Sequence, residues 1–260
     1  HNVKVSVLTN YRSVETKIEN QFDANLGIEI LRIRRHKFLG FTYLNRILAF
    51  RKLMRIEKPT IVIATGKFSL WLVAFGIRNA TCEKIAVIHG SEVNLKVKWQ
   101  HKLVDRALKH FKKVIAVSLY SKSLIANLNL KTVSVIPNGF DISNFENNNE
   151  SIQLIGNPKL ITVGAMSQRK GQHNVIKKLP ALIKLFPRIH YHIVGTPNEQ
   201  NKLMDLSLRL GVDRHVTFHG ILDQKTLNNF LSECDIFVML SEQTANGEVE
   251  GFGIAILEAN

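Results

Sequence analysis

Short apolar runs rich in Val and Ile recur along the first half of the chain, and patterns with a helical period lie between them. Near-continuous apolar runs are typical of strands buried on both faces, and their alternation with helices is typical of a parallel sheet. Strands are expected at 3–9, 28–33, 60–64, 84–89, 114–117 and 132–136, and helices at 43–57, 68–77, 98–112 and 121–127. The first half therefore predicts an α/β unit whose sheet is covered on both faces.

The same alternation starts again after a polar stretch. Pro137, Asn138 and Gly139 predict a turn, and the Asn-rich stretch at 144–149 predicts a linker. Beyond it, strands are expected at 160–163, 190–194, 216–219 and 236–240, and helices at 175–186, 199–210 and 225–233. We therefore expect two Rossmann-like, doubly wound parallel-sheet domains, at 1–141 and 158–260, joined by a linker at 142–157. Because such sheets bind ligands beyond the carboxyl ends of their strands, both domains should face one cleft.

Both ends of the sequence predict a truncated chain. The last residue, Asn260, falls inside an apolar helical pattern at 253–259 that has no cap, and the second domain shows only four strands where about six are common. At the other end, no glycine-rich strand-to-helix loop precedes Val3. We therefore expect both domains to be incomplete.

Positive charge is concentrated in the first half. Residues 1–141 hold 24 Lys and Arg against 9 Asp and Glu, a net +15, whereas residues 142–260 hold 11 against 12, a net −1. This asymmetry favours an anionic partner, which could be nucleic acid, an anionic membrane surface or an anionic substrate; a solvated basic surface is the plain alternative. The stretch at 96–113 alternates basic and apolar residues, which predicts either an interfacial helix or an ordinary helix with a basic outer face.

The cysteines and the hydropathy indicate a compartment. Cys82 and Cys234 lie far apart in the sequence and form no metal-ligand spacing, which fits a reducing environment. No apolar run approaches the ~20 residues that a membrane span needs. The expected localisation is cytoplasmic, with peripheral attachment at the inner face of the membrane as the option that the charge raises.

The candidate chemistry is concentrated near the C-terminal end. Glu250 and Glu258 flank seven residues that begin with a glycine pair, Gly251 and Gly253, at the start of an expected helix. Glycines allow a ligand to approach the backbone, and the N–H groups of a helix start favour a phosphate. On a helix the two carboxylates lie roughly 12 Å apart along the axis, which suits one at each end of a sugar diphosphate. The alternative is that Glu250 caps the helix and Glu258 is solvated.

Several further motifs give this segment a context. In chain order they are VIHGSE (87–92), VIPNGFD (135–141), VG (163–164), RKG (169–171), IVG (193–195), FHG (218–220) and EGFGIAILE (250–258). In this order and at this spacing the sequence resembles the group-1 retaining glycosyltransferases of the GT-B fold, a family that includes the phosphatidylinositol mannosyltransferases. The resemblance runs through nearly the whole chain.

The resemblance implies a role for each matching position. Glu250 would hold hydroxyls of the donor hexose, Glu258 the ribose and Lys170 the diphosphate, which needs a cation as the nucleotide leaves. The other implied donor contacts are His89, facing the hexose from the first domain, Leu222 against the nucleobase, and the backbone at Gly251, Phe252, Gly253 and Ile254. The arginine that the family carries five residues before the lysine is Ala165 here, so Arg169 is the candidate substitute.

Plain alternatives stand beside these roles. His89 could simply end a strand, Lys170 could be a solvated loop residue, and Leu222 could belong to the core. The remaining histidines, among them His190, His192, His215 and His219, show no metal-ligand spacing, and no paired-aspartate motif that would hold a divalent cation is present. We therefore expect metal-independent chemistry without a cofactor.

The expected function is a retaining glycosyltransferase that moves a hexose from a UDP- or GDP-hexose to a lipid-linked or glycan acceptor. A nucleotide-sugar epimerase or a phosphorylase would use the same fold. A basic nucleic-acid-binding protein is a distant third reading, because neither base-stacking aromatics on a sheet nor a helix-turn-helix or zinc signature is found.

Overall fold

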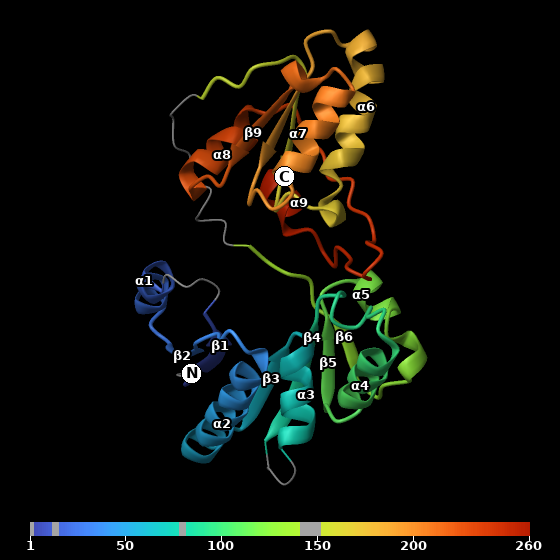
Figure 1. Ribbon diagram of the computed structural model, residues 1–260. Helices are drawn as coiled ribbons and strands as arrows, with labels where there is room; N and C mark the ends of the chain where they lie inside the picture. Colours follow the sequence, from blue (N-terminus) through green and yellow to red (C-terminus); the bar gives the residue numbers. More distant parts are fainter. Residues whose placement is uncertain (1–2, 12–15, 78–81, 141–151) are drawn as a thin grey trace.

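The computed structural model describes residues 3–11, 16–77, 82–140 and 152–260. Two α/β units follow one another along the chain, drawn from blue to green and from yellow to red in Figure 1. All ten expected strands are present, most of them with ends shifted by one to three residues. The expected α/β fold class with parallel sheets is therefore confirmed. The predicted linker at 142–157 lies mostly outside the described residues.

The first unit contains two parallel sheets where a single sheet was expected. Its main sheet has the order β3-β4-β5-β6, while β1 and β2 pair only with each other among the described strands. As a result β3 is an edge strand, with Ile61 and Ile63 51% and 64% exposed. The elements are β1 (Ser6–Asn10), α1 (Lys17–Asn25), β2 (Glu29–Ile33), α2 (Leu39–Glu57), β3 (Ile61–Thr65), α3 (Lys67–Gly76), β4 (Glu83–Ile88), α4 (Lys98–Leu108), β5 (Lys113–Ala116), α5 (Leu119–Ser123), a 3₁₀ turn (Ala126–Leu128) and β6 (Val133–Val135).

Helix α4 corrects the interpretation of the stretch at 96–113 as an interfacial helix. Val104 and Leu108 are fully buried in the core of the first unit, so most of the apolar face packs inward, and of the large apolar residues on the helix only Trp99 stays largely exposed. The helix ends at Leu108 and not at 112, because the N–H of Lys112 already donates to the carbonyl of Lys84 at the edge of the sheet. The alternative of an ordinary helix with a basic outer face is the one that the packing supports.

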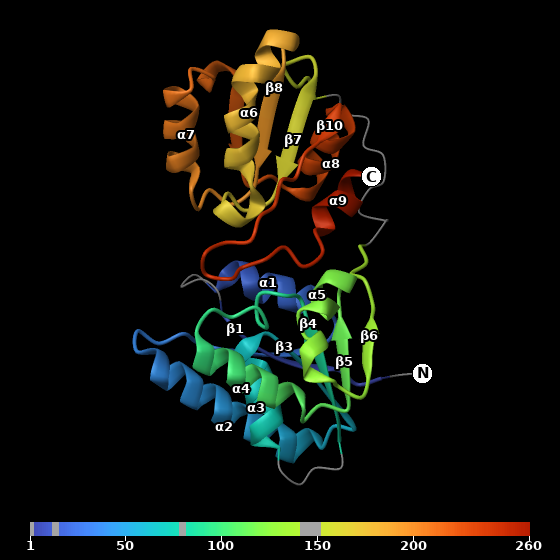
Figure 2. The same ribbon diagram turned by 90° about the vertical axis from the view of Figure 1, so that its right-hand side faces the viewer.

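The second unit is doubly wound. Its parallel sheet has the order β10-β7-β8-β9, so the direction of strand progression reverses between β7 and β10. Figure 2 shows α6 and α7 on one side of this sheet and α8 on the other. The elements are β7 (Lys159–Val163), a 3₁₀ turn (Gln168–Lys170), α6 (Gln172–Leu185), β8 (His190–Val194), α7 (Gln200–Arg209), a 3₁₀ turn (Asp213–His215), β9 (Val216–Gly220), α8 (Gln224–Glu233), β10 (Ile236–Phe237) and α9 (Ile254–Ala259).

Strand β10 is shorter than the expected strand at 236–240. Only Ile236 and Phe237 pair with β7, and after the N–H of Val238 has donated to the carbonyl of Ile161 at 2.8 Å the chain leaves the sheet. The segment from 239 to 253 then runs as a loop toward the first unit before α9 begins (Figure 1). This loop carries four of the ten predicted site residues, Glu250, Gly251, Phe252 and Gly253.

Alternation along β8 gives the two faces of the second sheet different chemistry. Tyr191 and Ile193 pack under α6 and α7, whereas His190 and His192 point to the α8 side. There the ring of His192 lies 4.8 Å from that of His190 and 5.2 Å from that of His219, and His192 Nδ1 lies 3.0 Å from His219 Nε2. Burial, together with a smaller contribution from the neighbouring His192, lowers the pKa of both His190 and His219 from 6.5 to about 4. The pKa of His192 is lowered by burial as well, so all three imidazoles are neutral at pH 7.

This cluster predicts a loss of stability in weak acid. A histidine whose pKa is lowered by folding contributes stability that is complete above the unfolded pKa of 6.5 and is lost as the pH falls toward the folded value of about 4. Between pH 7.5 and 5 we expect the free energy of unfolding to fall by about 1–2 kcal/mol for each of His190 and His219. Urea unfolding of His219→Gln should show a shallower decline than the unchanged chain. Parallel declines would show that this histidine is not a source of the pH dependence.

Candidate functional site

A cavity of about 500 Å³ lies where the two units meet. The cavity is lined by segments that follow strands. In the first unit these segments follow β4, β5 and β6, and in the second unit they follow β7 and β10. This is the carboxyl edge of both sheets, and in the second unit it is the point where the strand order reverses, the usual place for a ligand in a doubly wound sheet. The lining residues are His89, Ser91, Val117, Asn138, Arg169, Lys170, Glu248, Val249, Glu250, Gly251, Phe252, Gly253, Ile254 and Ala255.

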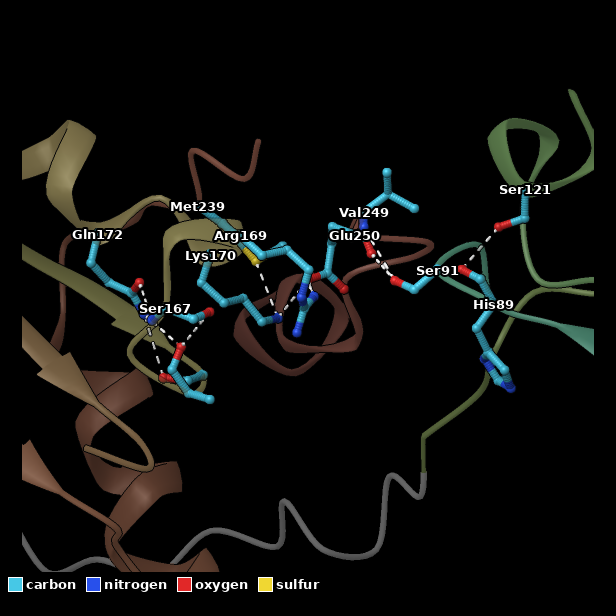
Figure 3. A network of polar contacts seen from close by, with 12 residues as sticks. His89, Ser91, Ser121, Ser167, Arg169, Lys170, Gln172, Met239, Val249 and Glu250 are labelled. Atoms are coloured by element: carbon cyan, nitrogen blue, oxygen red, sulfur yellow. Dashed lines mark hydrogen bonds and ion pairs between the residues drawn. The ribbon is translucent and has the colours of Figure 1, made fainter. Parts of the chain in front are cut away.

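The loop after β10 touches the first unit through its backbone (Figure 3). Ser91 Oγ donates to the carbonyl of Val249 and accepts from its N–H, both at 3.2 Å. Asn94 Nδ2 donates to the carbonyl of Gly247 at 2.9 Å. A Cβ on Gly251 would lie 1.6 Å from the carbonyl oxygen of His89, so this contact requires glycine. Residues 247–251 are therefore held against the loop at 89–94.

Two adjacent cations reach the cavity from the turn after β7. Arg169 and Lys170 both contact one carboxylate oxygen, Oε2 of Glu250; Arg169 does so through Nη1, and Lys170 through Nζ at 2.9 Å. Lys170 Nζ also lies 3.8 Å from Met239 Sδ. Figure 3 shows the side chains of Arg169 and Lys170 converging on Glu250 from the same side. The predicted diphosphate cations and the predicted hexose-binding carboxylate therefore form one cluster.

A second carboxylate, Glu242, holds the turn that carries these cations. Its side chain accepts hydrogen bonds from Asn174 and Gln168, both at 3.1 Å, and these lower the pKa of Glu242. Its own N–H donates to the carbonyl of Arg169 at 3.0 Å. Glu242 thus ties the loop after β10 to the turn after β7. This role could not be predicted from the sequence, because the partners are 68 and 74 residues away.

His89 lines the cavity from the first unit. Its N–H donates to Glu92 Oε1 at 2.5 Å, and its carbonyl accepts from Ser121 Oγ at 3.2 Å. The backbone is therefore fixed on both sides, while the imidazole points away from the contact between Ser91 and Val249 (Figure 3).

Eight of the ten predicted site residues line the cavity, and two do not. Leu222 packs against the core cluster of Ile161, Val194 and Phe230, as expected if it belongs to the core. Glu258 is partly exposed on α9 and is not among the lining residues. A role of either residue toward the nucleotide stays a prediction. Helix α9 begins at Ile254 and has six residues, so the expected helix at 253–259 is confirmed but short.

Several lining residues were not predicted as site residues. Ser91 and Asn138 stand inside motifs that the sequence analysis singled out, so the motif itself was the available signal. Glu248 and Val249 lie on an irregular loop and carry no such signal. A second hollow, of about 580 Å³, lies against α7, but Lys202, Asp205, Leu208 and Arg209 all come from that one helix. It brings no groups together from different elements.

The described residues contain neither a metal-binding cluster nor a membrane-spanning helix. Among them, no three His, Cys, Asp or Glu side chains are grouped so that they could hold a metal ion. None of the described helices combines the length and the apolar character needed to cross a bilayer. Metal independence stays a prediction.

Solved structures with a similar backbone define the fold. The crystal structure of Anabaena Alr3699/HepE in complex with UDP-glucose matches with a TM-score of 0.72 at 17% identity, over 98% of this chain and 77% of that one. Sucrose-phosphate synthase from Thermosynechococcus elongatus matches with a TM-score of 0.73 at 14% identity, over 99% and 79%. The two units therefore have the GT-B fold of glycosyltransferases.

Family models identify the chain more closely. The model described as Glycosyltransferase Family 4 matches residues 1–144, and the model described as Glycosyl transferases group 1 matches residues 144–260. The chain belongs to glycosyltransferase family 4, with a group-1 glycosyltransferase domain in its second half.

Curated relatives extend the comparison. A GDP-mannose-dependent monoacylated α-(1-6)-phosphatidylinositol monomannoside mannosyltransferase of Corynebacterium glutamicum is 30% identical over 49% of this chain and 36% of its own length. A GDP-mannose-dependent α-(1-6)-phosphatidylinositol monomannoside mannosyltransferase of Mycolicibacterium smegmatis is 27% identical over 68% and 49%. The amylovoran biosynthesis glycosyltransferase AmsK of Erwinia amylovora is 22% identical over 77% and 54%. These matches span about a third to a half of the relatives' own lengths.

Proposed function

We propose that the protein is a retaining, metal-independent glycosyltransferase that moves a hexose from a UDP- or GDP-hexose to a lipid-linked or glycan acceptor. The observation that carries this proposal is the cluster of Arg169, Lys170 and Glu250 at the cavity between the units. Two cations beside a carboxylate suit a sugar diphosphate, whose phosphates need positive charge and whose hydroxyls need an acceptor. The printed name of the C. glutamicum relative, a GDP-mannose-dependent enzyme, and the UDP-glucose complex of HepE support a donor of this class.

The parts of the cavity suggest a division of labour. Arg169 and Lys170 would hold the diphosphate and stabilise the negative charge that builds up on it as the glycosidic bond breaks. Glu250 would hold hexose hydroxyls, and the backbone at Gly251–Ile254 would lie along the sugar and phosphate. His89 would face the hexose from the first unit, and the acceptor would then approach from that side of the cavity. Holding donor and acceptor between two units also limits the access of water to the reacting bond.

The reaction is tested by supplying the chain with a panel of UDP- and GDP-hexoses and separate lipid-linked and glycan acceptors without added divalent cation. The proposal expects transfer with retained anomeric configuration, read by NMR of the product, and the same rate in EDTA. Epimerisation of free donor without transfer would favour the epimerase, and sugar phosphate formed with inorganic phosphate would favour the phosphorylase. Inversion of the anomeric centre, or a strict requirement for a cation, would contradict the proposed mechanism.

Helix α2 supports a lipid surface as the location of the acceptor. Phe41, Leu44 and Leu48 are 58%, 49% and 54% exposed, and their spacing places them on one stripe of the helix. The stripe continues into the exposed basic residues Arg51 and Lys52. Apolar side chains followed by basic ones are suited to the headgroup region of an anionic membrane. The printed names of the two mannosyltransferase relatives, whose acceptors are phosphatidylinositol mannosides, agree with this placement.

The membrane proposal predicts salt-sensitive vesicle binding. Vesicles of phosphatidylglycerol and phosphatidylcholine should retain the chain at low salt and release it at high salt, while vesicles of phosphatidylcholine alone should retain less. Replacing Leu44 and Leu48 together by glutamine should lower retention about tenfold, because the exposed apolar area is lost. The matched control replaces Leu185 and Leu208, exposed leucines of the second unit, in the same way. Equal losses in both double variants, or no retention at low salt, would remove α2 as the contact.

A further inference from the structure

The carboxylate of Glu250 binds the same cations that a diphosphate would need. Its Oε2 contacts both Arg169 Nη1 and Lys170 Nζ, and in the described part of the chain it is the only carboxylate within 4 Å of either cation. The side chain of Arg169 is 27% exposed, that of Lys170 12% and that of Glu250 20%. Water therefore screens these ion pairs incompletely. Diphosphate oxygens that approach Arg169 and Lys170 therefore compete with Glu250 Oε2 for the positive charge of both side chains.

We propose that Glu250 is an internal competitor of the diphosphate: it gives up Arg169 and Lys170 when a nucleotide-sugar binds, and takes them back as the nucleoside diphosphate leaves. This inference rests on the proposed function of the cavity and goes beyond it. A diphosphate carries more negative charge and more acceptor oxygens than one carboxylate, so it displaces Glu250 from Arg169 and Lys170. The displaced carboxylate is then available to the hydroxyls of the hexose.

This exchange of partners affects the affinity for the nucleotide-sugar and the affinity for the nucleoside diphosphate differently. A nucleotide-sugar compensates the lost ion pairs, because its hexose hydroxyls can donate to Glu250. A nucleoside diphosphate has no hexose, so it must displace Glu250 from both cations without giving the carboxylate a new partner. Glu250 therefore lowers the affinity for the product relative to the donor and favours its release after transfer.

The chain contains a matched control for the charge of Glu250. Glu248 lines the same cavity two residues earlier, is exposed, and makes no ion pair with Arg169 or Lys170 within 4 Å. Glu250→Gln and Glu248→Gln therefore remove the same charge from the same cavity, but only the first frees the two cations. A general effect of net charge on a diphosphate would appear in both variants.

The test is isothermal titration of the unchanged chain, Glu250→Gln and Glu248→Gln with UDP and GDP, and with UDP-glucose and GDP-mannose. We expect Glu250→Gln to bind the preferred nucleoside diphosphate about fivefold to tenfold more tightly and to release it more slowly in stopped-flow measurements. Glu248→Gln should change the affinity by less than about twofold. The preference for the nucleotide-sugar over the nucleoside diphosphate should shrink only in Glu250→Gln. In a Lys170→Ala background the gain from Glu250→Gln should become smaller, because one of the two contested cations is gone.

The outcomes separate the exchange from the proposed function. If the nucleoside diphosphate binds Glu250→Gln no more tightly than the unchanged chain, or if both glutamine variants gain equally, the exchange is wrong while the nucleotide site stands. If none of the folded proteins binds any of the four nucleotides, the proposed function fails and the exchange fails with it. Far-ultraviolet circular dichroism shows whether each variant is folded.

Discussion

Replacing Lys170 by alanine should weaken the binding of a nucleoside diphosphate by about a hundredfold. The side chain of Lys170 is 12% exposed and its Nζ lies 2.9 Å from Glu250 Oε2. The ammonium group of Lys170 therefore already binds an anionic group at this position. A charge-assisted hydrogen bond in such a place contributes ~1.5–3 kcal/mol, and a diphosphate offers Lys170 at least one. Isothermal titration with UDP and GDP measures the loss directly.

The control for this variant is Lys178→Ala. Lys178 lies exposed on α6 in the same unit, so its replacement removes an equal charge at a distance from the cavity. We expect the affinity for the nucleotide to fall by less than about twofold, because solvent and salt screen its charge. Similar losses in both variants would mean that net charge alone attracts the nucleotide, and that Lys170 does not contact it.

A Gly251→Ala substitution should lower the transfer rate by at least about a hundredfold, because misplacing a binding group by about 1 Å has an effect of this size. The new Cβ would lie 1.6 Å from the carbonyl oxygen of His89, a backbone atom that cannot yield to it. The loop at 247–251 must therefore move away from the first unit, and Glu250 moves with it. Initial transfer rates measured beside thermal unfolding separate this displacement from a general loss of the fold.

Gly139→Ala is the matched control for the glycine. Gly139 follows Asn138 at the edge of the same cavity, and apart from its two chain neighbours no described residue has an atom within 4 Å of a Cβ placed there. This variant should keep the transfer rate within about a factor of three. A Gly251→Ala protein with full activity would show that the tight contact with His89 is not part of the working arrangement.

The sequence predicted the fold well because burial on both faces of a parallel strand leaves a clear apolar run. Strand β8 lies at 190–194 as expected, and α7 and α8 begin and end within one residue of the predicted bounds. Helix α1 was missed because it contains few apolar residues, so no apolar face stands out in its sequence. Strand β10 was predicted too long, because the apolar run at 238–240 continues after the backbone has left the sheet. The separation of β1 and β2 from the main sheet could not be predicted, because the apolar pattern of one strand does not show which other strand it pairs with.

The site was predictable where a motif and its chemistry coincide. Arg169, Lys170 and Glu250 were expected from charge, glycine pattern and family resemblance, and they form one cluster. The contact of Ser91 with Val249 spans 158 residues, so only the folded chain shows it. The ion pairs of Glu250 were not expected either, because the sequence assigned the carboxylate to the sugar and the cations to the phosphate. They became visible only when the loops after β7 and β10 were placed side by side.

Amide hydrogen exchange in the presence of a nucleotide-sugar tests most directly whether the cavity between the units binds the donor. We expect the preferred UDP- or GDP-hexose to slow exchange at 168–171 and 248–255, and to leave the face of α7 around Lys202 and Arg209 unchanged. Protection should fall when Lys170 is replaced by alanine. Protection confined to α7, or unchanged exchange at 168–171 and 248–255 when nucleotide binding is saturated, would show that the donor does not bind in this cavity.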